Sequence, residues 1–282
     1  MEPVLYVVAT PIGNLRDITL RALEVLAAAD LVAAEDTRNT ARLLTHHGIS
    51  AHRLMPVHQH NERAAAEKII ALIKLGQSVA FVSDAGTPAV SDPGALLVQA
   101  VRAAGLRIIP IPGANAAIAA LSASGLDTPH FLFHGFLPCK PAARRTALES
   151  VRDQSSTLIF YEAPHRIVEC IADLAAVLGK ERQIVLAREL TKLFETIHSC
   201  ALGEAKAWLL ADSNRQRGEF VILVSGAVLQ PGLSEEVKRM LETLLEELPL
   251  KQAVQLAARI SGASRNELYK WALQLKTFQG SI

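Results

Sequence analysis

Short apolar runs rich in β-forming residues alternate with helical patterns along most of this chain, and this alternation limits the possible folds more than any other feature. In the first half, runs typical of buried strands lie at residues 4–9, 31–34, 53–57, 78–82 and 107–111. Helical patterns lie between and after them, at residues 19–30, 37–47, 61–75, 93–104 and 114–122. Strands that alternate with helices predict a mostly parallel sheet covered on both faces.

The alternation starts again near residue 131. Strands are predicted at residues 131–136, 157–161, 183–187, 195–199 and 219–225, and helices at 144–152, 164–178 and 202–211. Two prolines interrupt the pattern in 137–143, so we expect the first of these helices to begin only after them. From residue 235 onward the patterns are helical alone, at residues 235–247, 251–260 and 265–275.

The chain is therefore predicted to be α/β, with two α/β domains and a small C-terminal helical extension. We place the domains at residues 1–125, 126–228 and 229–282, with boundaries in the Gly125–Pro129 and Ala227–Ser234 segments. The last two helices flank a turn that contains Gly262, which resembles a helix-turn-helix; a small helical appendage is the alternative interpretation.

Composition excludes several classes of protein. Half of the residues are apolar and the net charge is +1, which is the opposite of a disordered chain. No run of apolar residues is long enough to span a membrane, and the N-terminus lacks the basic start of a secretory signal. The cysteines Cys139, Cys170 and Cys200 lie far apart, with no CxxC pair. We therefore predict a cytoplasmic protein with reduced thiols and no bound metal.

Four of the predicted strands end in unusual loops, at residues 10–14, 35–38, 83–94 and 110–117. Ligands bind at the C-terminal ends of strands in open α/β sheets. The chain has no GxxxxGK[ST] or GxGxxG phosphate loop, no HExxH and no GxSxG. The loops instead offer backbone groups, small side chains and a few carboxylates, which suits an uncharged or cationic ligand with an amino-acid end. Taken singly, each loop is explained equally well by turn formation.

Taken together, the loops are more specific. The following segments occur in this order: TPIGNLRDITLRALEVLAAADLVAAEDTR, SDAGTPAVSDPG, IPGANAAIAALSASGL, FHGFLP, FYEAPHR, ARELTK and GEFVILVSG. From about Tyr6 to Gly226 the chain resembles the tetrapyrrole-methylase superfamily, in particular its bacterial ribosomal RNA branch. The helical tail also resembles the C-terminal extension of that branch.

The resemblance implies two α/β domains with S-adenosylmethionine in the cleft between them, a homodimer and no metal. It implies 2′-O-methylation of a cytidine ribose in the decoding centre of small-subunit rRNA, either free or within the 30S ribosomal subunit. Two alternatives stay open. One is a C-methyltransferase of a corrinoid or sirohaem tetrapyrrole precursor, and the other is a non-catalytic RNA or ribosome-assembly module that retains the fold.

Site residues follow from positions in the matched motifs. The resemblance assigns the methyl donor to Pro11, Ser83, Asp84, Ala85, Gly86, Val90, Ala116, Ala117, Tyr161, Glu162, Ala187 and Arg188. Methyl transfer to a hydroxyl needs alignment and removal of a proton. The first candidates for these catalytic roles are Glu189 and Lys192, and the others are Asp36, His165, Glu35 and Glu162. An ordinary ion pair that lines a polar cleft is the alternative interpretation of each.

RNA binding requires local positive charge, because the whole chain is nearly neutral. Candidate RNA contacts are Arg38, Arg42, Lys140, Arg144, Arg145 and Arg166. Five histidines, His46, His47, His52, His58 and His60, fit no known set of metal ligands and suggest either a polar surface that faces RNA or a solvated loop. After Leu248 the chain carries five basic residues against Glu267 alone, which predicts a further local basic patch.

Overall fold

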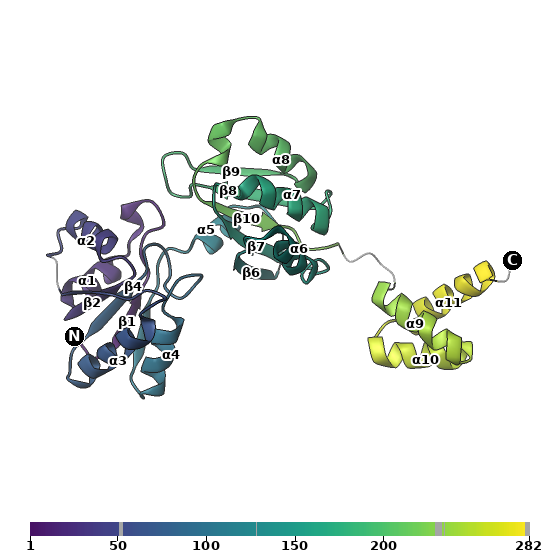
Figure 1. The fold of residues 1–282 in the computed structure, drawn as a ribbon, viewed down its shortest axis with the longest axis horizontal. Coiled ribbons are helices and arrows are strands. Elements are labelled where there is room, and N and C mark those ends of the chain that lie inside the picture. Colours follow the sequence, from purple (N-terminus) through teal and green to yellow (C-terminus); the bar gives the residue numbers. More distant parts are fainter. Residues whose placement is uncertain (51–52, 128, 229–232, 234, 280–282) are drawn as a thin grey trace. The chain divides into compact units, whose positions relative to one another are not determined.

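The computed structural model describes residues 1–50, 53–127, 129–228, 233 and 235–279. It divides into two compact units, Met1–Ala227 and Val228–Ile282 (Figure 1). The α/β fold class with C-terminal helices is confirmed. The predicted domain boundaries stay predictions, and parts of them (residues 128, 229–232 and 234) lie outside the described residues, as does His52 of the histidine cluster.

The first sheet of Met1–Ala227 is parallel throughout, as the alternation predicted. Its order is β3-β2-β4-β1-β5. The strands are β1 (Leu5–Val8), β2 (Leu31–Ala34), β3 (Leu54–Pro56), β4 (Val79–Val82) and β5 (Ile108–Ile111). Because the strands are parallel, their C-terminal ends meet at one edge of the sheet, and the loops after β1, β2, β4 and β5 lie together there.

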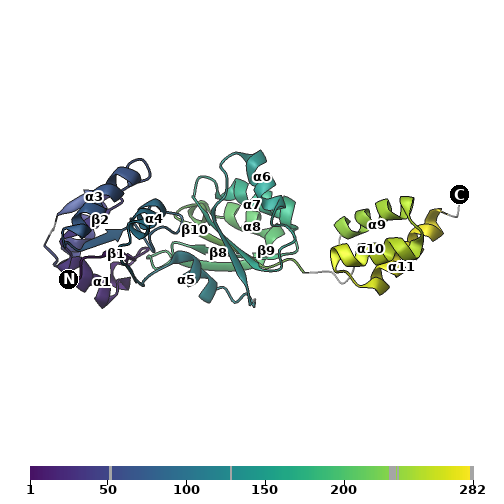
Figure 2. The same ribbon diagram turned by 90° about the horizontal axis from the view of Figure 1, so that it is seen from below.

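Helices cover both faces of this sheet because its strands are apolar on both sides. The helices are α1 (Leu20–Ala28), α2 (Thr37–His46), α3 (Glu62–Lys74) and α4 (Ala95–Ala103), with the short η1 (Leu15–Asp17) before α1. Leu26 of α1 packs with Tyr6 and Val8, whereas Ile69 of α3 packs with the alternate residue Leu5. Successive side chains of a strand point to opposite faces, so α1 and α3 lie on opposite sides of the sheet (Figure 2).

The second sheet has the order β6-β7-β10-β8-β9, and here the expectation of mostly parallel strands is wrong. The strands are β6 (Phe131–Phe136), β7 (Thr157–Glu162), β8 (Gln183–Arg188), β9 (Thr196–Ala201) and β10 (Phe220–Val224). Only β6 and β7 pair in parallel; the other three pairings are antiparallel. The reason is that β8 continues into β9 without a crossover helix, and β10 returns to lie between β7 and β8.

Three helices cover one face of the second sheet: α6 (Pro141–Glu149), α7 (Ile167–Leu178) and α8 (Leu202–Leu210), which is followed by η2 (Ser213–Gln216). The other face is covered by α5 (Ala116–Ser122), although α5 follows the last strand of the first sheet (Figure 1). Ala117 and Ala120 of α5 pack with Val221 and Leu223 of β10. The chain thus leaves the first sheet and covers the second before it adds any strand to the second.

Two helices begin at residues other than those predicted. The expectation that the prolines of 137–143 delay α6 is wrong, because the helix begins at Pro141 itself. Proline suits the first helical position, where its fixed φ matches the helix and its missing N–H is not needed. Conversely, Pro164 lies outside α7, which begins at Ile167 after a turn capped by Arg166.

The C-terminal unit is a three-helix assembly of α9 (Glu235–Glu247), α10 (Leu250–Ser261) and α11 (Arg265–Gln279). Its core joins Leu241 of α9, Val254 and Ala257 of α10 and Leu268 of α11. Gly262 ends α10 in a left-handed conformation, which glycine adopts without steric cost. In the described part of the chain, no helix combines the length and the apolar character that a membrane span requires.

A buried ion pair joins α6 to α7. The side chain of Arg144 is 1% exposed, and its Nε and Nη2 atoms lie 2.7 and 2.6 Å from Asp173 Oδ2. Arg145 binds the other carboxylate oxygen at 2.7 Å. Burial alone would raise the pKa of Asp173, but the hydrogen bonds from Arg145 and Arg144 outweigh it and hold that pKa below its ordinary value.

Replacement of Asp173 by alanine should therefore lower the free energy of unfolding by about 3–5 kcal/mol, because it leaves the Arg144 guanidinium buried without its charge partner. Denaturant unfolding measures the loss. Glu169→Gln is the matched control, because Glu169 is exposed and lies 3.8 Å from the same guanidinium. An equal loss in both variants would contradict the central role of Asp173.

Candidate functional site

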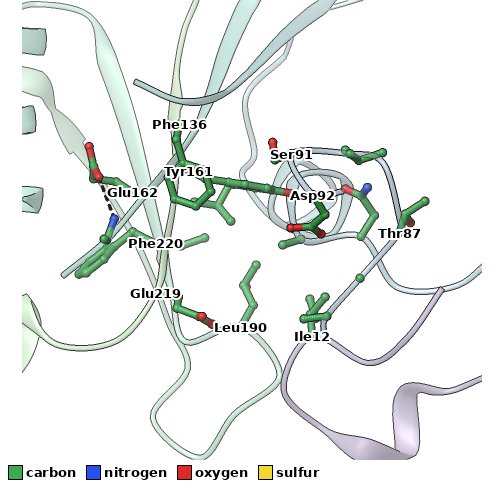
Figure 3. A pocket seen from close by; sticks show the side chains of 18 of the residues that line it. Ile12, Thr87, Ser91, Asp92, Phe136, Tyr161, Glu162, Leu190, Glu219 and Phe220 are labelled. Atoms are coloured by element: carbon green, nitrogen blue, oxygen red, sulfur yellow. Dashed lines mark hydrogen bonds between the residues drawn. The ribbon is translucent and has the colours of Figure 1, made fainter. Parts of the chain in front are cut away.

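A cavity of about 320 Å³, here called the main cavity, lies at the edge where the loops of the first sheet meet the second sheet (Figure 3). Its wall on the first-sheet side comes from the loops after β1, β4 and β5. The opposite wall comes from β7, β8 and β10 and from the loop after β8. Seven of the residues predicted to bind the methyl donor line it: Ala85, Gly86, Val90, Ala116, Tyr161, Glu162 and Ala187.

A second, smaller cavity of about 270 Å³ adjoins these loops and shares Ile12 and Ala85 with the first. The remaining predicted donor residues of the first sheet, Pro11, Ser83 and Asp84, line this side cavity together with Arg42. The predicted donor set is therefore divided between two neighbouring hollows.

The loops after β1 and β4 are tied together by their backbones. Thr10 and Gly86 exchange two hydrogen bonds of 2.9 and 3.0 Å in an isolated antiparallel bridge. Gly86 has a φ of +74°, and a side chain there would approach Ile12. Glycine at this position therefore serves the turn as well as the open wall of the cavity.

Backbone strain marks the two loops that face each other across the site. The non-glycine residues with positive φ are Ala89 and Ser91 in the loop after β4, and Glu189 and Thr191 in the loop after β8. Strained residues persist only where the surrounding structure holds them, and they concentrate at ligand sites.

The loop after β1 closes directly on the loop after β8. The Asn14 N–H donates to Thr191 Oγ1 at 3.0 Å. A methyl group on Gly13 would lie 2.6 Å from Lys192 Cγ and 2.9 Å from the Leu190 carbonyl oxygen, so only glycine fits this approach.

Tyr161 connects β7 to α5. Its hydroxyl accepts the Ala117 N–H at 3.2 Å. Ala117, which was predicted to bind the donor, therefore contacts Tyr161 through its backbone and lines neither cavity. Burial raises the pKa of Tyr161, which stays protonated at neutral pH. In Figure 3 its side chain extends from β7 toward Asp92.

Arg188, also predicted to bind the donor, lines neither cavity. Its guanidinium donates to the carbonyl oxygens of Asn214, Arg217 and Phe194 at 2.9–3.1 Å. It therefore holds the loops around β9 and η2 in place and has a structural position.

The predicted catalytic pair is assembled, with a third member that the sequence did not reveal. Lys192 lines the main cavity, and its Nζ donates to Glu189 Oε1 at 2.9 Å and to Glu219 Oε2 at 2.8 Å. Burial lowers the pKa of Lys192, but the two carboxylates outweigh this effect and hold the pKa above its ordinary value. Lys192 is therefore a cation and cannot act as a base at neutral pH.

Of the other four catalytic candidates, Glu162 lines the main cavity, whereas Asp36, His165 and Glu35 do not. Asp36 forms an ion pair of 2.7 Å with Arg38, whose hydrogen bonds lower the pKa of Asp36 to about 2. Its backbone N–H donates to Asp84 Oδ1 at 3.1 Å, at the side cavity. His165 is exposed, directly after Pro164, which does line the main cavity.

The predicted RNA contacts separate into two groups. Arg38, Arg42, Lys140 and Arg145 are exposed. The assignment of Arg144 is wrong, because its buried guanidinium is taken up by Asp173. Arg166 is directed inward as well: it pairs with Glu162 at 3.2 Å and donates to the Leu137 carbonyl oxygen at 2.6 Å.

Sequence reasoning missed several residues that line the main cavity. They are Ile12, Thr87, Ser91, Asp92, Asn115, Phe136, Ala163, Pro164, Leu190, Glu219, Phe220 and Val221. Asp92 lies inside the SDAGTPAVSDPG segment, where an aspartate before Pro-Gly is also an ordinary turn residue. Burial raises its pKa to about 6, with further contributions from the charges of Glu35 and Asp84.

Metal chemistry finds no support in the arrangement of side chains. Among the described residues, no three histidine, cysteine, aspartate or glutamate side chains are grouped so that they could hold an ion.

Comparisons with known proteins agree with this geometry. The family model for Tetrapyrrole (Corrin/Porphyrin) Methylases matches residues 4–206, and that for the RsmI C-terminal HTH domain matches residues 231–276. Ribosomal RNA small subunit methyltransferase I of Escherichia coli is 53% identical over 271 residues, which are 96% of this chain and 94% of the relative. The protein of the same name from Pseudomonas aeruginosa is 53% identical over 273 residues, 96% of each chain.

Among solved structures, uroporphyrin-III C-methyltransferase from Thermus thermophilus, complexed with S-adenosyl homocysteine, superposes with a TM-score of 0.54. It is 17% identical and covers 78% of this chain and 96% of its own. At this identity the likeness supports the fold alone.

The close fit of Gly13 gives a test of the site's construction. Gly13→Ala should lower the free energy of unfolding by about 1–3 kcal/mol, because the added methyl group overpacks the contact with residues 190–192. Denaturant unfolding measures this loss. Gly203→Ala is the control, because its methyl group would meet only Lys180, at 3.1 Å, and should have the smaller effect.

Proposed function

The chain belongs to the tetrapyrrole methylase family, and on this premise we propose that it is an S-adenosylmethionine-dependent methyltransferase that acts on small-subunit rRNA. The observation that carries the proposal is the main cavity, which joins strand-end loops of the first sheet to the second sheet in a chain that matches named rRNA methyltransferases over 96% of its length. The tetrapyrrole alternative is weaker, because solved structures of the uroporphyrin enzyme from Thermus thermophilus are 16–22% identical, whereas the rRNA methyltransferases of Escherichia coli and Pseudomonas aeruginosa are 53% identical.

The cavity suits such a donor in size and chemistry. Its volume of about 320 Å³ lies within the range of small-molecule sites, roughly 300–1,000 Å³. Small residues, Ala85, Gly86 and Ala116, leave space for the adenosine, and Leu190 and Val221 give it an apolar wall. The carboxylates around the cavity favour a positively charged ligand over a polyphosphate. When bound, the donor supplies a methyl group on a sulfonium, which is a good leaving group.

For the acceptor, we propose the ribose 2′-hydroxyl of a cytidine in the decoding centre. The motif resemblance from Tyr6 to Gly226 supports this choice. Such a hydroxyl must be aligned with the methyl group and must lose its proton. Lys192, fixed as a cation between Glu189 and Glu219, is suited to stabilise the negative charge that develops on the ribose oxygen.

RNA would approach over exposed cations, namely Arg42, which lines the side cavity, and Arg38, Lys140 and Arg145. The C-terminal unit offers a separate basic surface. Lys251 and Arg259 of α10 are exposed two turns apart, and Arg265 and Lys270 of α11 are exposed as well. By contrast, the sequence of α9 carries five glutamates. We include the α10–α11 surface in the proposed RNA contacts because of this separation of charge.

A cytoplasmic location accords with an RNA substrate, and a homodimer accords with the exposed apolar residues Phe131 and Leu132 of the edge strand β6. Exposed apolar edge strands are normally covered by another chain or element. Light scattering of the purified chain would reveal the dimer.

The decisive experiment is methyl transfer to small subunits from a strain that lacks the enzyme, followed by mapping of the modified nucleotide. The expected product is a single 2′-O-methylated cytidine. A methyl group on a base would refute the proposed acceptor, and methylation of a tetrapyrrole precursor instead of RNA would refute the substrate class.

Replacement of Lys192 by methionine should lower the turnover number by about 10²-fold or more, a loss typical of removing one electrostatic stabiliser. The donor dissociation constant, measured by calorimetry, should stay within about threefold, as the loss falls on the transition state. A parallel loss of donor affinity would contradict this role. Lys180→Met, outside both cavities, is the control.

Replacement of both Lys251 and Arg259 by glutamine should weaken binding to small subunits. The slope of log affinity against log salt should fall by about one for each lost phosphate contact. Glu242→Gln with Glu246→Gln, on exposed positions of α9, is the matched control and should not weaken binding. Unchanged affinity in the α10 variant would exclude this surface.

A further inference from the structure

Asp92 lines the main cavity within the SDAGTPAVSDPG segment, and the motif resemblance assigned no role to it. It follows the strained Ser91, whose φ is +68°, and precedes the Pro93-Gly94 turn that leads into α4. Figure 3 shows its carboxylate directed into the cavity, on the side opposite Leu190. The Ala89 N–H donates to the Pro93 carbonyl oxygen at 3.2 Å, so the backbone of the loop closes on both sides of Asp92.

The other acidic side chains at the site are already engaged. Glu189 and Glu219 share the ammonium group of Lys192. Glu162, which also lines the main cavity, is buried beside Arg166: its Oε1 lies 3.2 Å from the Arg166 guanidinium and accepts the Ala163 N–H at 2.8 Å, while its Oε2 has no hydrogen-bond partner among the residues that the structure describes.

At the side cavity, Asp36 is paired with Arg38, and Glu35 accepts the Asp84 N–H at 3.2 Å. None of the ion pairs among the described residues includes Asp92. Among the acidic residues that line the main cavity, it is thus the one without a cationic partner.

Its surroundings make Asp92 a stronger base than an ordinary aspartate. It is half-buried, and the carboxylates of Glu35 and Asp84 lie on the loops after β2 and β4 beside it. Tyr161 approaches from β7, and a contact with the Ser83 hydroxyl opposes the effect of the carboxylates. The resulting pKa of about 6 leaves the group ionised at neutral pH yet able to hold a proton, which is the condition for an efficient general base.

We propose that Asp92 accepts the proton of the ribose 2′-hydroxyl during methyl transfer, an inference that rests on the proposed function. As the O2′–H bond breaks, the proton moves to a carboxylate oxygen of Asp92. The freed electron pair of O2′ forms the bond to the methyl carbon, whose former bonding pair stays on the donor sulfur. Asp92, now a neutral acid, returns the proton to solvent after the methylated RNA leaves.

The charges of Lys192 and Asp92 determine the role that each can take. Lys192 lies on the opposite wall of the same cavity and holds its proton, so it can face the developing negative oxygen without competing for the proton. Asp92 is the group with an open site for that proton. The two side chains therefore take the two roles that the sequence alone had assigned to the pair Glu189 and Lys192.

The test compares the full-length wild-type chain with Asp92→Asn. Single-turnover methyl transfer to small subunits should fall by about 10²–10⁴-fold in the variant, the usual contribution of a general base. The wild-type rate should rise with pH through about 6, and the residual rate of the variant should lose this step. Calorimetry with S-adenosylmethionine should give dissociation constants within about threefold of each other, as the lost step follows binding.

A second readout needs neither donor nor RNA. Folding raises the pKa of Asp92 from its ordinary 3.8 to about 6, so the folded chain holds this proton more tightly than the unfolded chain. The contribution of this proton to the free energy of unfolding is fully present below about pH 4 and is lost as the pH rises through about 6. The amide introduced by Asp92→Asn does not titrate, so the melting temperature of the variant relative to wild type should increase over this interval. Asp17→Asn, on an exposed site outside both cavities, should show no such trend.

Each outcome supports or refutes the proposed role of Asp92 as the proton acceptor. If the wild type methylates small subunits and Asp92→Asn retains at least a third of its rate, the proposal fails while the proposed function stands. A loss of donor affinity in parallel with rate, or a flat difference in melting temperature with pH, also overturns it. If the wild type transfers no methyl group to RNA, the proposed function fails and the role of Asp92 fails with it.

Discussion

The packing of α5 on the second sheet is the interaction on which the rest of the site depends. This helix follows β5 of the first sheet, yet Ala117 and Ala120 are buried against β10 and its neighbours. Small residues allow the helix to lie close to the sheet, and the Tyr161 hydroxyl, from β7 of the same sheet, accepts the N–H of Ala117 in its first turn. The loops at the edge of the first sheet are thereby held against the second sheet, and the main cavity forms along that line.

Charged side chains make the parts of the site electrostatically different. Carboxylates from the loops after β2 and β4 make the first-sheet side negative, and Lys192 brings one cation to the opposite wall. Arg38 neutralises Asp36 at the outer end, while Asp92 keeps its charge unpaired within the main cavity. A nearly neutral chain can thus hold a patterned site, because most charges at the site are paired locally, as Asp36 is with Arg38 and Glu189 with Lys192, and few stay unpaired.

The sequence allowed the alternation of elements to be predicted, since it depends on local patterns, but only the smaller part of the main-cavity wall: seven donor residues and Lys192. Ala85, Gly86 and Val90 were predicted from their positions in the SDAGTPAVSDPG segment, through its resemblance to the family, because turn composition alone does not distinguish a binding loop from an ordinary turn. The antiparallel part of the second sheet was not predictable in this way, as it depends on β10 pairing with strands far back in the chain. The burial of Arg144 was not predicted for the same reason, because its partner Asp173 lies on another helix. A run of basic residues is also typical of an exposed surface. The position of Asp92 in the main cavity was not predicted, because aspartate is common both in turns and as a half-buried base.

The four strained residues, Ala89, Ser91, Glu189 and Thr191, have a consequence for the protein under heat. Each costs of the order of 1–3 kcal/mol that neighbouring contacts must offset. Segments that carry such costs open at lower free energy than the strands beneath them. The ligand-binding edge is therefore expected to lose its form while both sheets are still intact, so that working temperature is limited by the loops and not by the melting of the core.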